Sequence, residues 1–209
     1  MEQIKQQYID YLTQHKKRPA SVAAFAKNIG ISEKNFYEHY SSFAALEEAV
    51  WDDAFNETIA KLRKDSVFDQ YNAREKMLSM YYGYIETLKN FRSFAEITYN
   101  MRGRINRRIC GEPSLFGKLK KSFNNFVKDI INDGIYSGEI ADRYLLTDRY
   151  GDFLWLQMEF ILGFWIRDNS QNFERTDAAI EKAVNLAFDL LGKNIADATF
   201  DFVKFILAR

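Results

Sequence analysis

The chain has 209 residues, with 29 basic and 29 acidic side chains and no formal net charge. A composition of 47% hydrophobic and 16% aromatic residues with two prolines indicates a folded chain with a sizeable core and argues against a disordered one. The neutral charge speaks against nonspecific binding of polyanions, and the single cysteine, Cys110, excludes an intrachain disulfide.

The first four predicted elements are helices. Ser21 and Ser32 each precede a short apolar-periodic stretch and are therefore predicted as N-caps. Gly30 lies between these two stretches, where a tight turn needs a left-handed backbone. The predicted helices cover Glu2–His15, a short stretch between Ser21 and Gly30, another from Ser32 to about Tyr40, and a long one from about 42 to 64 that Ser41 or Ser42 caps.

The remainder of the chain also has helical periodicity and no strand alternation of useful length. A segment rich in turn residues, Asp133–Arg143, predicts a loop. A further helix is possible within the tail, Lys193–Arg209. The other predicted helices lie near Ala73–Asn90, Arg92–Ile109, Ser114–Asn132, Leu146–Asp168 and Asp177–Leu191. The predicted fold class is therefore all-α.

Motifs for catalysis or for a cofactor are missing from the sequence. The chain has two histidines, His15 and His39, which cannot assemble a histidine-based metal cluster. Glycine-rich phosphate or dinucleotide signatures and a G-x-S-x-G element are also absent. We therefore expect no enzyme activity, no metal and no cofactor.

The start of the chain is polar and lacks the apolar segment of a secretory signal. The most apolar stretch, Phe153–Ile166, is shorter than a bilayer requires and contains Glu159. We expect a cytoplasmic protein with no membrane partner.

The segment from Ser21 to Tyr40 has the features of a helix-turn-helix that reads DNA. Such a unit needs two short, closely packed helices joined by a glycine-containing turn, so that the second helix can enter the major groove. Small residues in the first helix permit the close approach, and Phe36 anchors the second helix while its polar neighbours face outward. The alternative is a helical bundle whose turn only looks like a DNA reader.

Residue types at fixed spacing across Ser21–Val50 resemble the amino-terminal domain of TetR-family transcriptional regulators. The matching residues are Ala26, Gly30, Ile31, Ser32, the pair Phe36–Tyr37, His39, Tyr40 and Leu46. The resemblance implies a helix-turn-helix DNA-binding domain over residues 1–45. It also implies a larger helical domain for ligand binding and dimerisation over residues 46–209, with the fourth helix connecting the two.

The resemblance also implies roles for individual residues of the head, residues 1–45. Ser21, Tyr37 and His39 match positions that bind phosphate, which positions the protein without reading sequence. Lys34 and Asn35 have side chains suited to guanine and adenine edges. Glu33 either accepts a hydrogen bond from cytosine or, in the first turn of its helix, interacts favourably with the helix dipole. The full predicted DNA-binding set is Ser21, Ser32, Glu33, Lys34, Asn35, Tyr37 and His39.

Two further sites are implied in the larger domain. A subset of its aromatic residues would line a cavity for a flat or apolar effector, although packing explains most of them equally well. The predicted lining is Tyr81, Tyr84, Phe94, Tyr99, Phe123, Trp155 and Met158. Two helices with apolar residues on more than one face would pair across a twofold axis. The predicted dimer interface is Phe160, Phe164, Trp165, Ala183, Leu186 and Leu190.

The head departs from the family pattern where the fourth helix starts. Phe43 and Ala44 stand where the family has a phosphate-binding lysine and a glutamate. Six basic and four acidic residues up to Ala45 leave the head at +2, which is a weak charge for a DNA-binding domain. The leading hypothesis is a ligand-responsive repressor that binds a palindromic operator as a homodimer. The alternative is a TetR-like small-molecule or lipid carrier that has lost DNA binding.

Overall fold

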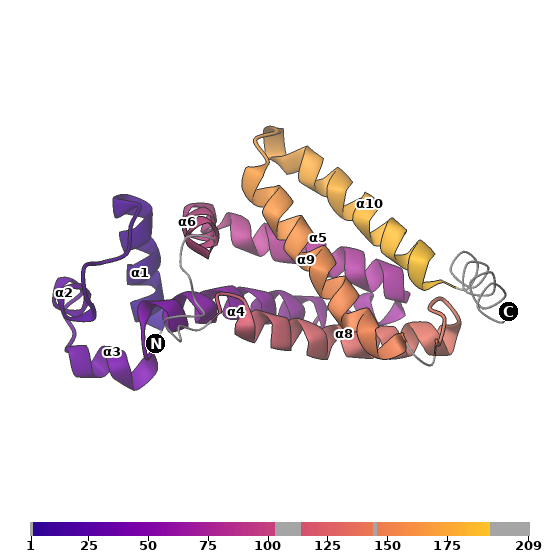
Figure 1. Cartoon of the computed structure of the whole chain (residues 1–209), viewed down its shortest axis with the longest axis horizontal. Coiled ribbons are helices and arrows are strands. Elements are labelled where there is room, and N and C mark those ends of the chain that lie inside the picture. Colours follow the sequence, from indigo (N-terminus) through magenta and orange to yellow (C-terminus); the bar gives the residue numbers. More distant parts are fainter. Residues whose placement is uncertain (1, 103–113, 144–145, 193–209) are drawn as a thin grey trace, which may run out of the picture. The chain divides into compact units, whose positions relative to one another are not determined.

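The computed structural model describes residues 2–102, 114–143 and 146–192, and all regular elements within these ranges are helices (Figure 1). The predicted all-α class is confirmed. The α-helices are α1 Glu2–His15, α2 Val22–Asn28, α3 Glu33–His39, α4 Phe43–Leu62, α5 Ala73–Lys89, α6 Arg92–Arg102, α8 Gly117–Ser137, α9 Tyr150–Arg167 and α10 Glu174–Leu191. Short 3-10 turns occupy Phe68–Gln70, Thr147–Arg149 and Gln171–Phe173.

Local capping explains where α2, α3 and α4 start. The Oγ atoms of Ser21 and Ser32 accept hydrogen bonds from backbone N–H groups three residues ahead, both at 3.1 Å. Ser42 does the same for Ala45 at 3.1 Å and so caps α4. Each bond satisfies one of the backbone donors that a helix start leaves without a partner. The predicted caps at Ser21 and Ser32 are confirmed, and Ser42 rather than Ser41 caps α4.

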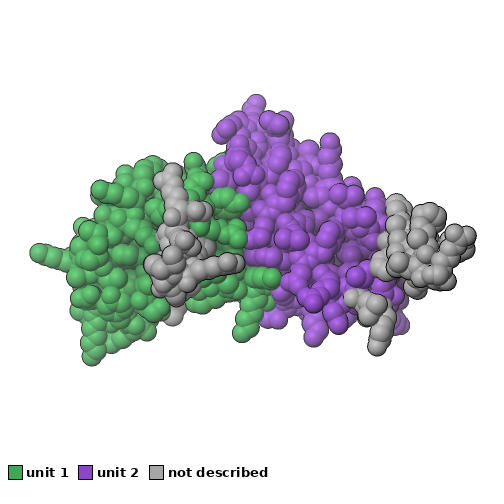
Figure 2. All heavy atoms as spheres, in the orientation of Figure 1, with its two compact units in different colours: residues 1–57, 86–122 green, residues 58–85, 123–209 purple. Residues whose placement is uncertain are grey.

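Residue contacts divide the chain into two compact units, which Figure 2 distinguishes by colour. Unit 1 contains Met1–Glu57 and Glu86–Ser122, and unit 2 contains Thr58–Ile85 and Phe123–Arg209. This division differs from the predicted boundary between residues 45 and 46. The reason lies within unit 1, where α1 packs against α6 and α4 binds α6 through the 3.0 Å bond from Trp51 Nε1 to Thr98 Oγ1.

Carboxylates distant in sequence also cap helices. In unit 1, Glu48 of α4 is buried and accepts a 3.0 Å bond from the backbone N–H of Lys118 in the first turn of α8. In unit 2, Glu139 accepts from the backbone N–H groups of Ala73 and Arg74, at 2.9 and 3.1 Å, at the start of α5. Negative charge at a helix amino terminus also interacts favourably with the helix dipole.

The predicted loop over Asp133–Arg143 is wrong in its first part, because α8 continues to Ser137. Gly134 is buried inside this helix, and a Cβ there would lie 2.7 Å from Cδ1 of Ile140. The glycine therefore permits a close approach and does not make a turn. The chain turns instead at Gly138, whose φ is +81°.

Other predicted boundaries shift by a few residues. The helix predicted from Asp177 begins at Glu174, and the one predicted from Leu146 begins as a 3-10 turn before α9. The last seven residues of the predicted helix Arg92–Ile109 lie outside the described residues, as do Cys110 and the possible tail helix. Among the described helices none combines the length and apolarity needed to cross a bilayer.

Candidate nucleic-acid interface

The turn between α2 and α3 has the geometry that the sequence predicts. Gly30 has a φ of +75°, the left-handed region that residues with a side chain rarely occupy. The next residue, Ile31, returns its N–H to the carbonyl of Ala26 at 3.0 Å. These two features close the chain between two seven-residue helices, so that α3 follows α2 after a short turn.

An aromatic cluster anchors the inner side of α3. Phe36 is fully buried, and its ring meets Phe25 of α2 edge-on at 6.2 Å between centroids. Tyr40, also buried, lies 5.9 Å from the same ring. Edge-to-face pairs of this kind stabilise beyond the area that they bury. The inner face of α3 is thereby fixed, and the other side of the helix faces outward.

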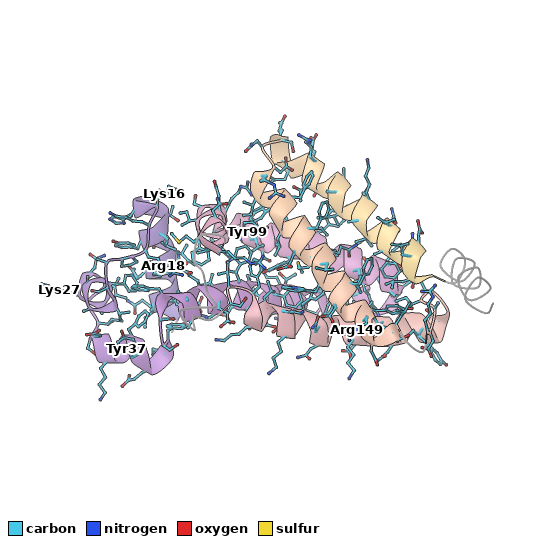
Figure 3. All side chains as sticks on the ribbon, in the orientation of Figure 1. Lys16, Arg18, Lys27, Tyr37, Tyr99 and Arg149 are labelled. Atoms are coloured by element: carbon cyan, nitrogen blue, oxygen red, sulfur yellow. The ribbon has the colours of Figure 1, made fainter. Side chains whose placement is uncertain are left out.

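The outer side of α3 and its N-cap carry the predicted contact residues except Ser21, which caps α2. Tyr37, which Figure 3 labels on α3, has an exposed side chain, and its exposed fraction is 51%. Asn35 is half-buried, and its Nδ2 donates to Oε2 of Glu38 at 3.4 Å. Neither Tyr37 nor His39 is covered by the described chain. The exposed side chains of α3 and its cap are Ser32, Glu33, Lys34, Tyr37, Glu38 and His39.

Phe43, at the position where the resemblance implies a lysine, belongs to the aromatic cluster. Its ring stacks on Tyr8 of α1 at 5.2 Å with 16° between the planes. It also meets Phe25 and Phe36 edge-on at 5.7 and 5.6 Å. The first residue of α4 therefore joins three head helices. Where the resemblance implies a cation, the half-buried ring of Phe43 packs here against residues of these helices.

The charge balance of the head is less basic than its sequence suggests. Two of its six cations are tied to carboxylates of α4, Lys5 to Asp53 and Arg18 to Glu47. The four exposed lysines, Lys16, Lys17, Lys27 and Lys34, stand against four exposed carboxylates, Glu2, Asp10, Glu33 and Glu38. The solvent-facing surface of the head is thus close to neutral.

The pairing of Arg18 was not predicted from the sequence, where Arg18 counts only as a basic residue. Its Nε and Nη2 donate to Oε1 and Oε2 of Glu47 at 2.8 and 2.7 Å. Glu47 is 2% exposed and lies 29 positions away in sequence. The sequence does contain a sign of this pairing, because Glu47 follows a run of apolar residues in α4. A charged residue in such a run is seldom fully buried without a partner of opposite charge.

Most of the side chains that are predicted to line an effector pocket are buried in the structure. In unit 2 the rings of Phe123 and Trp155 meet at 5.6 Å, and the hydroxyl of Tyr81 donates to Oε1 of Gln157 at 2.9 Å. Burial raises the pKa of Tyr81 well above its ordinary value. Tyr84, Phe94, Phe123, Trp155 and Met158 are also buried, while Tyr99 is half-buried. Phe94 and Tyr99 belong to unit 1 and the other predicted residues to unit 2.

An apolar groove of about 710 Å³ runs between α9 and α10 in unit 2. Phe160 is 52% exposed and Leu186 60% exposed, and Leu190 is exposed as well. Phe164 and Ala183 are half-buried in the groove lining. Trp165, which the sequence pattern predicts as an interface residue, is by contrast fully buried within the chain.

Two exposed residues of the groove, Phe153 and Leu156, were not in the predicted interface. With Phe160 and Phe164 they follow helical spacing along one face of α9. This spacing was visible in the sequence. Trp165 follows Phe164 directly and therefore lies on another face of α9, where its side chain is buried.

The comparisons with known proteins agree with this architecture. The family model described as "Tetracyclin repressor-like, C-terminal domain" matches residues 76–206. No curated protein matches the chain. Similar solved structures include the fatty acid degradation regulator FadR from Bacillus halodurans, with 15% identity, 90% of this chain and 97% of that chain covered and a TM-score of 0.64.

Two more structures share the fold at low identity. A protein of unknown function from Rhodococcus sp. RHA1 is 14% identical, with 92% and 95% of the two chains covered and a TM-score of 0.58. The TetR-family regulator PfmR from Thermus thermophilus is 11% identical, with 87% and 97% covered and a TM-score of 0.53. Since the family model spans more than half of the chain, and the head has the helix-turn-helix that the resemblance predicted, this chain belongs to the TetR family of transcriptional regulators.

Proposed function

We propose that the protein is a repressor that binds a palindromic operator as a homodimer and releases it when a small apolar or aromatic effector binds. The observation that carries this proposal is the presentation of α3. Its inner side is anchored by the fully buried Phe36, while Lys34, Tyr37 and His39 are exposed on its outer side. A helix held in this way can enter a major groove.

The proposed contacts divide into two kinds. Ser21, Tyr37 and His39 would bind phosphates, which positions the head without reading sequence. The Oγ of Ser21 already accepts the N–H of Ala24, but its hydroxyl hydrogen remains available to a phosphate oxygen. Lys34 and Asn35 would contact base edges. Ser32 and Glu33, at the amino terminus of α3, complete the predicted set.

The apolar groove between α9 and α10 supports the proposed homodimer. Monomeric proteins rarely leave a contiguous apolar surface of this kind uncovered, and a twofold interface uses the same patch on both partners. A dimer also offers two heads to two half-sites about one turn of DNA apart. Effector and operator would then be linked by a coupling free energy between their sites.

A second candidate, a carrier without DNA binding, is favoured by the charges of the head. Phe43 takes the place of the phosphate-binding lysine and packs inside the aromatic cluster. The outer side of α3 has one lysine, Lys34, against two carboxylates, Glu33 and Glu38. A surface with so few cations gains little from counterion release.

Selection of bound duplexes from random DNA, at low and at moderate salt, decides between the two functions. A repressor enriches a palindromic sequence, at least at low salt, whereas a carrier enriches none. Gel-shift titration of variants then tests the roles. Tyr37→Phe and His39→Ala should weaken binding evenly across operator variants, while Lys34→Ala should relax the preference at one base pair. A changed base preference from Tyr37→Phe alone would contradict the assigned roles.

A further inference from the structure

Arg18 of the head and Glu47 of α4 form a partly buried ion pair that no DNA-contact role uses. Both donors of the guanidinium fork engage the carboxylate, at 2.8 and 2.7 Å. The Arg18 side chain is 22% exposed and that of Glu47 2%. A bidentate pair of this kind fixes the orientation of both side chains, since the planar fork matches the carboxylate.

Glu47 joins three segments of unit 1. Besides Arg18, it accepts the hydroxyl of Tyr8 of α1 at 2.7 Å. Tyr8 is fully buried, and burial, with the neighbouring Glu47 charge, raises its pKa above the ordinary value. A single carboxylate of α4 therefore holds α1 and the segment that leads into α2.

Arg18 lies just before α2, so its ion pair with Glu47 restricts where this helix begins. Pro19 follows Arg18 and is buried, and Ser21, three residues after Arg18, caps α2. A chain held at Arg18 and stiffened by the fixed φ of proline has little freedom before α2 begins. The start of α2 in turn sets the turn at Gly30 and the direction of α3.

We propose that Arg18 and Glu47 are positioning residues for DNA binding, through an ion pair that docks the start of the helix-turn-helix onto α4. Arg18 thus acts without touching DNA; its side chain is half-buried, whereas that of Lys16, which Figure 3 labels on the same part of the chain, is exposed. This inference rests on the proposed function, because its consequence is read in DNA affinity. It assigns to a buried acidic residue a favourable role in binding a polyanion.

The direction in which Glu47→Gln changes DNA affinity distinguishes a positioning role from a purely electrostatic effect. Removing a carboxylate from a DNA-binding head normally strengthens binding, because one repulsive charge is lost. Glu47→Gln should instead weaken operator binding by about tenfold, equivalent to about 1.4 kcal/mol, because it disrupts the fork. The matched control is Asp10→Asn, which removes an exposed carboxylate of α1 and should leave binding equal or tighter.

Arg18→Lys provides the second test. A lysine that contacted phosphate would keep most of the affinity, but a lysine cannot reproduce the bidentate fork. We expect Arg18→Lys to weaken binding about tenfold with an unchanged slope of log affinity against log salt. Lys17→Met, in the same segment, serves as the control that removes an exposed cation; a phosphate contact there would reduce the slope by about one.

Hydrogen exchange of the free protein separates failure of this inference from failure of the proposed function. The peptide over residues 19–28 contains the Ala24 and Phe25 amides that bond to Ser21. Faster exchange there in Arg18→Lys and Glu47→Gln, with α9 and α10 unchanged, supports the positioning role even if wild-type protein binds no duplex. Unchanged exchange, or tighter DNA binding by Glu47→Gln, overturns it.

Discussion

Asp168 shows how one buried carboxylate organises the connection between two helices. It follows the last residue of α9, and its Oδ1 accepts from the N–H and hydroxyl of Ser170 at 2.8 and 2.7 Å. Its Oδ2 accepts from the N–H and hydroxyl of Thr176 at 2.9 and 2.6 Å, within the first turn of α10. Burial alone would raise the pKa of Asp168, but these hydrogen bonds favour the anion and lower its pKa from 3.8 to about 2.

This pKa predicts a pH dependence of stability. A pKa that is lower in the folded than in the unfolded chain contributes stability above about pH 4, and the contribution is lost as the pH falls towards 2. We expect it to amount to about 2 kcal/mol. We expect the difference in unfolding free energy between the wild type and Asp168→Asn, measured by urea titration, to become smaller as the pH is lowered from about 4 towards 2. An unchanged difference would refute the assignment.

Phe43 offers a second prediction at the residue scale. Phe43→Lys introduces the cation that the family resemblance implies at the start of α4, so DNA binding should tighten and its salt slope should increase by about one. The same change removes a ring from the cluster with Tyr8, Phe25 and Phe36. It should therefore cost about 1–3 kcal/mol of stability. Phe43→Leu is the control, with lowered stability and an unchanged salt slope.

At the scale of helices, two helical glycines differ in how closely neighbouring side chains approach them. Gly134 lies inside α8, where a Cβ would meet Cδ1 of Ile140 at 2.7 Å and Cβ of Ala73 at 3.1 Å. Gly151 lies in the first turn of α9, where a Cβ would find only ordinary contact, 3.9 Å from Oδ1 of Asn124. The first glycine is required by packing and the second is not.

Alanine substitutions should reveal this difference in thermal unfolding. Gly134→Ala should destabilise the protein by about 1–3 kcal/mol through overpacking. Gly151→Ala should be neutral or stabilise it by up to about 1 kcal/mol, because alanine is the better helix former. Equal effects of the two changes would show that the close approach of Ile140 does not constrain α8.

For the whole molecule, the apolar groove between α9 and α10 predicts the oligomeric state. Leu186→Glu places a charge in the proposed interface and should convert dimer into monomer in sedimentation measurements, since a buried unpaired charge is costly. Tyr136 of α8 is 96% exposed and lies outside the groove. Tyr136→Glu should therefore leave the oligomeric state unchanged. Dissociation by both variants, or by neither, would contradict the assigned interface.

Features that depend on residues within a few positions were predictable from the sequence. The caps at Ser21 and Ser32, the left-handed Gly30 and the anchoring Phe36 all follow from local rules of helix and turn formation, and the structure confirms them. The all-α class follows from apolar periodicity in the same way. The family match over residues 76–206 adds that the chain is a transcriptional regulator.

Only the tertiary structure decided which side chains meet across long separations. It paired Arg18 with Glu47, drew Phe43 into the aromatic cluster, buried Trp165, and placed Gly134 inside a helix. A sequence states the charge and size of these residues but not what packs against them. Capping and periodicity depend on neighbours along the chain, whereas burial and pairing depend on segments that only folding brings together.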